Sequence, residues 1–352
     1  MKTITTTQKT ATSLANWAYV VGRFQLPHVG HFALFKEALN RAEKVLVFIG
    51  SANASRNASN PFTEQEREQM LRLGLTAQEQ ARIQFIPIED FYCNDRWVQE
   101  LHDLAAQYRA DGETAIVVGK LKDFSSQYLK KLGLTLIEVH DTVQVDATAL
   151  RDIYFTQDKE GAYAVLANYT VPAVVDYLRA YAKTPPYAWL NRDYCATMQY
   201  RKDYPAAVHV TGDALVKCKD HILVIRRGGE IGNGQLALPG GFLEPNETVE
   251  EAPIRELVEE TRIAVVSSLF PVCKKAEAVF SAPKRSSRGR IITHAFLYDL
   301  GNCEKPDVQP ASDAKEAHWV KIEDLKHLRR EFFEDHFHII ESMLAKIKVS
   351  VR

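Results

Sequence analysis

The chain has 352 residues, of which 46% are hydrophobic and 25% charged, and its formal net charge is −1. The length favours two domains, and the near-zero charge gives no indication of nucleic-acid or membrane-surface binding. The five cysteines are scattered without C-x-x-C spacing, and the polar N-terminus lacks the apolar core of a signal peptide. We therefore expect a cytoplasmic protein with free thiols, no membrane span and a flexible leader over residues 1–16. A homo-oligomeric state stays open.

The first predicted elements form a strand–helix–strand unit. WAYVV (17–21) and KVLVFIG (44–50) are apolar runs typical of buried strands, and FALFKEALNRA (32–42) between them has a helical pattern. This order predicts a parallel sheet with a right-handed crossover. Ligands of such sheets bind at the carboxyl ends of the strands, where the loop GRFQLPHVGH (22–31) lies.

The loop between this strand and helix carries groups that suit phosphate. Gly22 lets the backbone approach a ligand closely, and Gly30 lies near the positive end of the helix dipole. His28 and His31, spaced H-x-G-H, can donate hydrogen bonds to phosphate oxygens at this point. The stretch resembles the signature of the H-x-G-H nucleotidyltransferase superfamily, which implies a reaction type without a substrate.

Two later stretches narrow the substrate. Residues 49–68 and IPIEDFYCNDRW (86–97) are similar to archaeal-type nicotinamide-mononucleotide (NMN) adenylyltransferases. The resemblance implies that Asp90, Asn94 and Trp97 line the NMN site. Asn94 would then pair with the carboxamide, and Trp97 would stack on the cationic pyridinium ring. Without the resemblance, Trp97 is more simply interpreted as a half-buried structural residue.

The rest of the first domain is predicted to be mainly helical. AIVVGK (115–120) has the pattern of another buried strand, and KDFSSQYLKKLG (122–133) that of the helix after it. Residues 161–183 are a helical stretch that Pro172 kinks or breaks. Residues 184–205 contain three prolines and have mixed polarity, so we place the linker between the domains there.

VDATALRDIYF (145–155) resembles the second signature of the same family. By this resemblance Thr148 and Arg151 hold the ATP phosphates, the arginine as a bidentate cation. Asp146 or Ala147 stands where the family usually has a serine. The resemblance implies an ATP and NMN site formed by Gly22, Arg23, Phe24, Gly30, Asp90, Asn94, Trp97, Gly119 and Thr148, with His28, His31 and Arg151 as catalytic donors.

The second domain begins with an alternating stretch over residues 206–228, which predicts a hairpin with its turn near Lys219 and Asp220. After it comes LALPGGFLEPNETVEEAPIRELVEETRI (236–263), a Gly-Gly turn, a polar loop and an acidic helix. This part of the chain carries the clearest functional pattern.

Three glutamates, Glu256, Glu259 and Glu260, share one face of this predicted helix because they are three and four residues apart. Like charges on one face repel unless a cation lies among them, and carboxylates suit hard cations such as Mg²⁺ or Mn²⁺. Arg255 can pair with Glu259 at i,i+4. The simpler alternative is a solvated acidic face, which is common in globular proteins.

The spacing of Gly241, Glu247, the pair Arg255-Glu256 and the pair Glu259-Glu260 resembles the Nudix box, G-x5-E-x7-R-E-U-x-E-E-x-G-U. The resemblance implies that Glu256, Glu259 and Glu260 are catalytic metal ligands. Two positions depart from the usual pattern.

Arg262 replaces the glycine that normally supplies a left-handed end of the helix, so we expect a changed helix exit. Pro253 lies early in the helix, so we expect a late or kinked start.

Residues 278–300 form a predicted basic loop and strand. On composition alone this loop is solvated. Its similarity to Nudix domains fused to adenylyltransferases implies instead that Arg288 and Arg290, with Gly240 and Gly241, bind the diphosphate substrate. A final strand and a C-terminal helix follow, in which His336 and His338 are interpreted as structural or exposed.

Together these features predict an α/β protein: a Rossmann-like, doubly wound parallel sheet over residues 17–183 and an α+β Nudix fold over residues 206–352. The chain resembles bifunctional enzymes that combine NMN adenylyltransferase with Nudix ADP-ribose pyrophosphatase. The resemblance implies ATP as co-substrate, divalent cations as cofactors, and NMN, NAD and ADP-ribose as small-molecule partners.

Three alternatives stay open at this point. The first domain could adenylylate another phosphate ester, such as phosphopantetheine or nicotinic acid mononucleotide. The second could hydrolyse a different diphosphate, such as NADH or a dinucleoside polyphosphate. It could also be a sensor that binds ADP-ribose or NAD without cleaving it.

Overall fold

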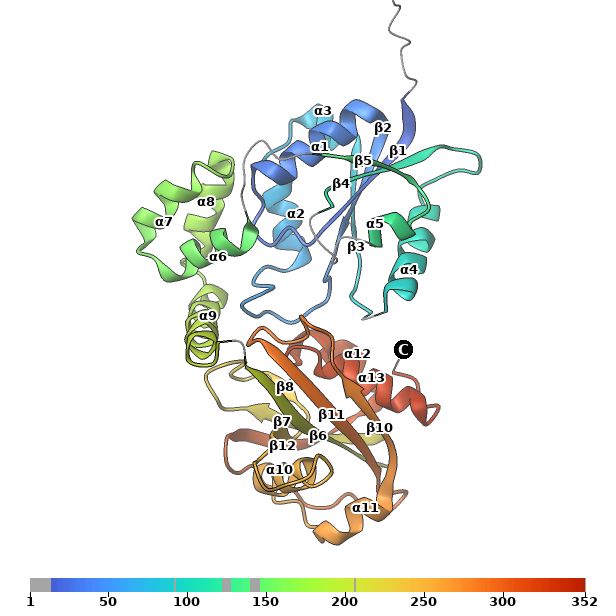
Figure 1. Cartoon of the computed structure of the whole chain (residues 1–352), viewed down its shortest axis with the longest axis vertical. Helices are drawn as coiled ribbons and strands as arrows, with labels where there is room; N and C mark the ends of the chain where they lie inside the picture. The colour runs from blue at the N-terminus through green and yellow to red at the C-terminus, as the bar shows by residue number, and fades with distance from the viewer. Residues whose placement is uncertain (1–13, 92, 122–127, 140–145, 206, 352) are drawn as a thin grey trace, which may run out of the picture. The chain divides into compact units, whose positions relative to one another are not determined.

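The computed structural model describes residues 14–91, 93–121, 128–139, 146–205 and 207–351 (Figure 1). Most of the leader expected over residues 1–16 therefore lies outside the described residues, and the first strand begins at Ala15. The chain divides into two compact units, each described by itself. The first unit comprises the chain up to Ala52, Glu64–Leu150 and Leu166–Val175; the second comprises Asn53–Thr63, Arg151–Val165 and the chain from Asp176 onward.

A five-stranded parallel sheet forms the centre of the first unit, as the alternation of strands and helices predicts. Its strand order is β3-β2-β1-β4-β5. Strands β2 and β3 are added on one side of β1 and strands β4 and β5 on the other, so the direction of strand addition reverses between β1 and β4. The strands are β1 (Ala15–Gly22), β2 (Ala42–Ile49), β3 (Ile83–Pro87), β4 (Ala115–Gly119) and β5 (Thr135–Glu138).

Both faces of this sheet are buried, which explains why its strands are continuous apolar runs. Ala18 and Val20 of β1 pack with Phe35 of helix α1 in one hydrophobic cluster. Tyr19, between them in the sequence, points to the other face and packs with Leu101 of helix α4. The prediction of a doubly wound fold is thus confirmed.

Helices cover the two faces, and several begin where the sequence suggests. The helix expected at 161–183 is broken, because α7 ends at Leu166 and α8 begins at Pro172. Of the helix expected at 122–133, residues 122–127 lie outside the described part. The helices up to α8 are α1 (Val29–Arg41), α2 (Glu64–Arg72), α3 (Ala77–Gln80), α4 (Asn94–Ala106), α5 (Tyr128–Lys131), α6 (Ala147–Thr156), α7 (Lys159–Leu166) and α8 (Pro172–Tyr181).

A mixed sheet forms the centre of the second unit, with main strand order β10-β11-β6-β7-β12. Strands β6 and β11 are parallel, whereas the other neighbouring pairs are antiparallel. The predicted hairpin is confirmed: β6 and β7 pair across a turn in which Lys219 has a φ of 52°. The strands are β6 (Val208–Cys218), β7 (His221–Arg227), β8 (Leu236–Ala237), β9 (Gly240–Phe242), β10 (Lys274–Phe280), β11 (Arg290–Asp299) and β12 (Ala314–Lys321).

Helices α10 and α13 pack on opposite faces of this sheet (Figure 1). Leu215 of β6 packs with Ile340 of α13, whereas its neighbour Ala214 packs with Leu257 of α10. This alternation follows from the two-residue period of a strand. The remaining helices are α9 (Pro185–Asp203), α10 (Ala252–Thr261), α11 (Phe270–Cys273), α12 (Leu325–Leu328) and α13 (His336–Lys346), with short 3₁₀ turns η2 (Ser267–Leu269), η3 (Ile322–Asp324) and η4 (Arg329–Glu331).

The segment expected to join the domains, residues 184–205, is mostly the single helix α9. Thr184 caps this helix by accepting a hydrogen bond from the Tyr187 amide, and Pro185 and Pro186 occupy its first turn, where they are tolerated. Asp193 and Arg201 of α9 bond to the backbone of Gly232 and Ser287 in the second unit. Within the described ranges, no helix has both the length and the apolar character that a membrane span requires.

Candidate functional site

A buried arginine of helix α2 anchors the loop after β1. Arg67 of α2 is fully buried, and its guanidinium donates to the carbonyls of Arg23 at 2.5 Å, Gly50 at 2.6 Å and Ser51 at 3.1 Å. Burial lowers its pKa to about 10, so the group remains charged at neutral pH. It therefore joins the ends of β1 and β2 at the edge of the sheet where a ligand is expected.

The backbone of this loop is tightly constrained. Phe24 and Leu26 have positive φ angles of 50° and 81°, which are uncommon for residues other than glycine. A Cβ on Gly22 would lie 2.8 Å from the Phe24 ring, so the tight turn requires glycine. The Phe24 side chain is buried in the hydrophobic core of the first unit, and Arg23 is exposed.

His28 and His31 form a reciprocal cap at the start of α1. The Gly30 amide donates to Nδ1 of His28 at 3.2 Å, and the His28 amide donates to Nδ1 of His31 at 3.3 Å. An imidazole nitrogen that accepts a hydrogen bond carries no proton, so the proton of each neutral ring lies on Nε2. The rings lie 3.8 Å apart between centroids. The motif thus has a structural role at the start of α1.

The residues expected to bind NMN lie near the start of α4. Asp90 is exposed after β3, and Asn94 is the first residue of α4. The Trp97 side chain is partly buried against the hydrophobic cluster on that face of the sheet. Gly119 ends β4, and a Cβ there would lie 2.8 Å from Leu129. The structure thus gives Trp97 and Gly119 packing roles, and their ligand contacts stay a prediction.

Helix α6 begins with Asp146 as its cap. The carboxylate of Asp146 accepts a hydrogen bond from the Thr148 amide at 3.1 Å, which is the role a serine can play at such a position. Thr148 is exposed and Arg151 is buried. The aspartate therefore substitutes for the usual serine as far as the helix start is concerned.

Helix α10, which carries the glutamates of the second unit, begins late, as predicted. Its first residue is Ala252, so Pro253 lies in the first turn, and no kink is needed. Pro253 packs against β6 at Gly212, where a Cβ would lie 2.7 Å from the proline ring. Cβ atoms on Gly240 and Gly241 would clash with the carboxylates of Asp213 and Glu256, so Gly240 permits close packing of β9 on β6 and Gly241 permits close packing of β9 on α10.

Arg255 connects the acidic residues of this region. Its guanidinium makes two bonds to Glu247, at 2.7 and 2.9 Å, one to Glu256 at 2.8 Å and one to Glu259 at 3.1 Å. The pairing lowers the pKa of Glu247, and burial, partly offset by Arg255, raises that of Glu256. The predicted i,i+4 pair of Arg255 and Glu259 is confirmed. A solvated acidic face is excluded for Glu256 and Glu260, whereas the Glu259 side chain is half exposed.

Glu260 is the most buried of the glutamates, with 2% of its surface exposed. Its Oε2 accepts a hydrogen bond from the Gly240 amide at 2.9 Å. Burial, together with the nearby carboxylates of Asp313 and Glu256, raises its pKa to about 9. Asp313 lies in the loop before β12, where Ser312 has a φ of 54° and the Asp313 carbonyl accepts from the Gly228 amide.

These carboxylates suit a divalent cation. Asp313 is close enough to raise the pKa of both Glu256 and Glu260, and Arg255 bonds only part of this set. Crowded, partly desolvated carboxylates favour a hard cation that offsets their charge. In the described ranges, however, no three His, Cys, Asp or Glu side chains converge as ligands, because Glu256 and Glu259 are turned toward Arg255.

The replacement of glycine by Arg262 leaves the helix exit unchanged. Arg262 adopts the left-handed conformation, with φ 41° and ψ 38°, and its amide donates to the Val258 carbonyl at 3.0 Å. The expectation of a changed exit is therefore wrong for the backbone. The next residue, Ile263, is buried in the same hydrophobic cluster as Leu257, and this packing maintains a conformation that costs a non-glycine residue about 1–2 kcal/mol.

The basic loop before β11 is mainly structural. Arg285 and Asp335 form a buried bidentate ion pair, with 3% and 2% of their side chains exposed. The interpretation of a solvated loop is therefore wrong for Arg285. Arg288 pairs with Glu334 at 3.4 Å and lies 5.2 Å from the centre of the Phe333 ring. Arg290 donates to the Ser281 carbonyl and lies at the start of β11.

The two C-terminal histidines differ. His336 is buried, and its Nδ1 accepts from the Leu238 amide at 3.1 Å, just before the Gly-Gly turn. Burial lowers its pKa well below the usual value, so the ring is neutral and structural, as predicted. His338 lies 3.4 Å from the Ser342 hydroxyl.

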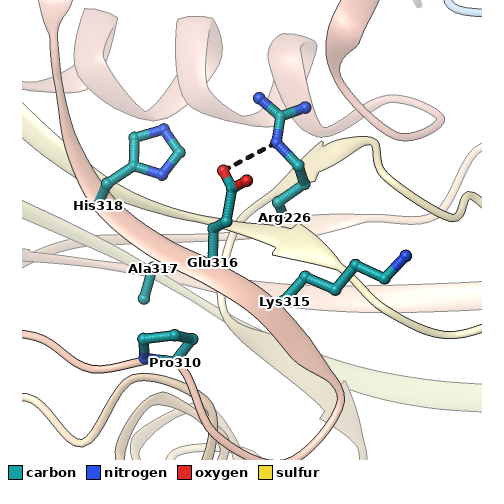
Figure 2. Close-up of a pocket in the computed structure, with 6 residues that line it drawn as sticks. All are labelled: Arg226, Pro310, Lys315, Glu316, Ala317 and His318. Carbon is teal, nitrogen blue, oxygen red and sulfur yellow. Dashed lines mark hydrogen bonds and ion pairs between the residues drawn. The ribbon is translucent and has the colours of Figure 1, made fainter.

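A pocket of about 430 Å³ in the second unit is lined by other residues. Figure 2 shows its lining on β7, β12 and the loop before β12, with Arg226 paired to Glu316 at 3.0 Å. None of its lining residues belongs to the Nudix box or to the predicted substrate-binding set. We assign the site from the carboxylate chemistry and not from this pocket.

Two groups in these regions were not anticipated from the sequence. Arg67 lies in an ordinary polar helix, and nothing in its spacing distinguishes a buried arginine. Asp313 is more than 50 positions from Glu260 along the chain, and only the folded sheet brings it to the box. An acidic residue just before a strand is a weak signal by itself.

The comparisons with known proteins agree with this arrangement. The cytidylyltransferase-like family matches residues 19–162, and the NUDIX domain family matches residues 208–343. The chain is 30% identical over 178 residues to a nicotinamide/nicotinic acid mononucleotide adenylyltransferase of Acinetobacter baylyi, which spans 50% of this chain and 92% of that protein. It is 37% identical over 129 residues to an ADP-ribose pyrophosphatase of Methanocaldococcus jannaschii, covering 36% and 71% of the two chains.

Fold and site thus define a nucleotidyltransferase domain followed by a Nudix domain. A solved structure with both domains, a bifunctional NMN adenylyltransferase/ADP ribose pyrophosphatase of Francisella tularensis complexed with AMP and a Mn ion, superimposes with a TM-score of 0.87. The match has 29% identity and covers 95% of this chain and 99% of that one; a second structure of the same protein is 30% identical. The chain belongs to this family of bifunctional NMN adenylyltransferase/ADP ribose pyrophosphatases.

Proposed function

We propose that the chain carries out two reactions in separate domains. Residues 17–183 would transfer the adenylyl group of ATP to NMN, giving NAD and pyrophosphate. Residues 206–352 would hydrolyse ADP-ribose to AMP and ribose 5-phosphate in the presence of Mg²⁺ or Mn²⁺. Both reactions would take place in the cytoplasm. The observation that carries the proposal is the presence, in one chain, of the capped H-x-G-H loop and the carboxylates around Arg255.

The adenylyl transfer requires alignment more than proton transfer. The 5′-phosphate of NMN is already an anionic nucleophile at neutral pH, so its attack on the α-phosphorus of ATP needs no general base. Catalysis then depends on positioning and on stabilising the charge that develops on the triphosphate. The Nε2–H groups of His28 and His31 are suitable donors, and the exposed Arg23 supplies positive charge at the same loop.

Helix α6 would supply the remaining phosphate contacts. Thr148 is exposed at its first turn, where backbone amides favour anions, and Arg151 follows one turn later. Asn94 and Trp97 favour NMN over another phosphate ester as the acceptor of the adenylyl group. An amide side chain can pair with a carboxamide, and an indole can stack on a cationic ring.

In the Nudix domain, Glu256, Glu259 and Glu260 would hold the divalent cation, with Asp313 beside Glu260. A bound cation supplies Lewis-acid polarisation of the diphosphate and offsets its charge. Arg255 keeps Glu247, Glu256 and Glu259 in a fixed arrangement through four charge-assisted bonds. The Gly240 amide orients Glu260. Gly240, Gly241, Arg288 and Arg290 would contact the diphosphate and its far end.

Two parallel reactions with the purified chain and Mg²⁺ test the proposal. One contains NMN and ATP, and the other contains ADP-ribose. Chromatography should show NAD and pyrophosphate in the first and AMP with ribose 5-phosphate in the second. Replacing NMN by nicotinic acid mononucleotide measures the acceptor preference of the first domain. Replacing ADP-ribose by NADH measures the substrate preference of the second. Intact ADP-ribose after prolonged incubation would contradict the hydrolytic half.

A further inference from the structure

Two cysteines of the second unit lie side by side although they are 85 positions apart in the chain. Cys218 is the last residue of β6 and is buried, whereas Cys303 follows β11 and is exposed. Their Sγ atoms are 3.7 Å apart, and both are free thiols in this structure. Neither cysteine belongs to the proposed catalytic groups.

Backbone hydrogen bonds on both sides of Cys218 maintain this proximity. The Leu300 amide donates to the Lys217 carbonyl at 2.8 Å, and the Lys219 amide donates to the Gly301 carbonyl at 2.8 Å. These bonds continue the parallel pairing of β6 and β11 beyond the last paired residues. The thiols are therefore close because of the sheet register, and a sulfur–sulfur bond requires only a short movement of the side chains.

We propose that Cys218 and Cys303 form an oxidation site, at which a hydroperoxide converts the two thiols into a disulfide. The exposed Cys303 reacts first: its thiolate attacks one peroxide oxygen, forming a sulfenic acid and releasing hydroxide. The Cys218 sulfur then attacks Cys303 Sγ and displaces the hydroxyl group, while the Cys218 proton passes to water. In total, two thiols and one hydrogen peroxide give one disulfide and two waters.

The order of reaction follows from exposure and charge. Burial raises the pKa of the Cys218 thiol to about 11, so this sulfur is a poor first nucleophile and is suited to the second, resolving step. The positive charges of Lys217 and Lys219 act in the opposite direction and favour the thiolate that the second step requires.

The disulfide would anchor a loop that reaches the Nudix site. After Cys303 the chain runs along the end of α10, where the Gln309 and Ala311 amides donate to the carbonyls of Thr261 and Glu260. It then reaches Asp313 beside the Glu260 carboxylate. A covalent bond at Cys303 would restrict the start of this loop in the unfolded and the folded chain.

Treatment of the native, full-length protein with hydrogen peroxide tests the proposal. Intact mass should fall by about 2 Da, as expected for loss of two hydrogens. Peptide mapping should link the peptides that contain Cys218 and Cys303. The melting temperature should rise by roughly 5–10 °C and return after reduction with dithiothreitol.

Cys303→Ser, a change at an exposed position, should abolish both effects, whereas Cys195→Ser, at another exposed cysteine, should leave them intact. The proposal would be overturned if peroxide gave only oxygen adducts on Cys303, or if Cys303 paired with another cysteine. An unchanged melting temperature of a chain shown to contain the 218–303 bond would contradict the anchoring role.

Discussion

Glu260 is the residue at which the structure makes the most specific prediction. Its carboxylate is buried, accepts a hydrogen bond from the Gly240 amide and lies against Asp313. A glutamine at this position keeps the oxygen that accepts from Gly240 and offers an amide hydrogen to Asp313. Glu260→Gln therefore removes a buried charge while retaining shape and hydrogen bonds.

The sign of the effect follows from the pKa. Burial raises the pKa of Glu260 from 4.5 to about 9, so folding favours the protonated form. The contribution of Glu260 to the free energy of unfolding is fully present below pH 4.5 and is lost as the pH rises toward 9. At pH 7.5, three pH units above 4.5, the loss is at most about 4 kcal/mol at 1.4 kcal/mol per unit. We expect Glu260→Gln to raise the free energy of unfolding at pH 7.5 by about 2–4 kcal/mol, and to leave it unchanged at pH 4.5.

Urea unfolding without divalent cations measures this difference. Added Mg²⁺ should stabilise the wild-type chain and have little effect on Glu260→Gln, which should also lose ADP-ribose hydrolysis. Glu250→Gln, the same charge change at an exposed position just before the helix, should alter neither stability nor hydrolysis. A Glu260→Gln chain less stable than wild type at pH 7.5 without cation would refute this reasoning.

Three further predictions concern single groups. Burial raises the pKa of Asp193 to about 6, so Asp193→Asn should stabilise the chain by about 2–3 kcal/mol at pH 7.5 and not at pH 3.8, as measured by urea unfolding. Arg262→Gly should raise the unfolding free energy by about 1 kcal/mol, because glycine adopts the left-handed conformation without strain. His31→Ala and His31→Asn should both lower the turnover of NAD synthesis about 100-fold with little change in KM; asparagine retains an acceptor for the His28 amide, so only alanine should also lose about 1 kcal/mol of stability.

The parts that could be predicted from the sequence are those in which local spacing determines the structure. Helical spacing placed Arg255 beside Glu259, and the early Pro253 indicated the late start of α10. Apolar runs around the loop of residues 22–31 predicted the parallel sheet, and the alternating stretch after the linker predicted the hairpin of β6 and β7.

The other features depend on contacts between distant segments. The bonds of Arg67 to three carbonyls and the approach of Asp313 to Glu260 arise from tertiary packing, which leaves no periodic pattern. Arg262 shows the same effect in the backbone, because packing maintains a left-handed conformation that the side chain disfavours. Composition alone assigns Arg285 to a solvated basic loop, and only the fold brings it to Asp335, 50 positions later in the chain.

The central claim is that one chain contains two independent active sites, and a pair of single substitutions tests it most directly. Glu256→Gln and His31→Ala should each be assayed with NMN plus ATP and with ADP-ribose, after circular dichroism shows that both variants are folded. We expect Glu256→Gln to lose ADP-ribose hydrolysis and keep NAD synthesis, and His31→Ala to show the reverse. Loss of both activities in either folded variant would contradict the two-site account.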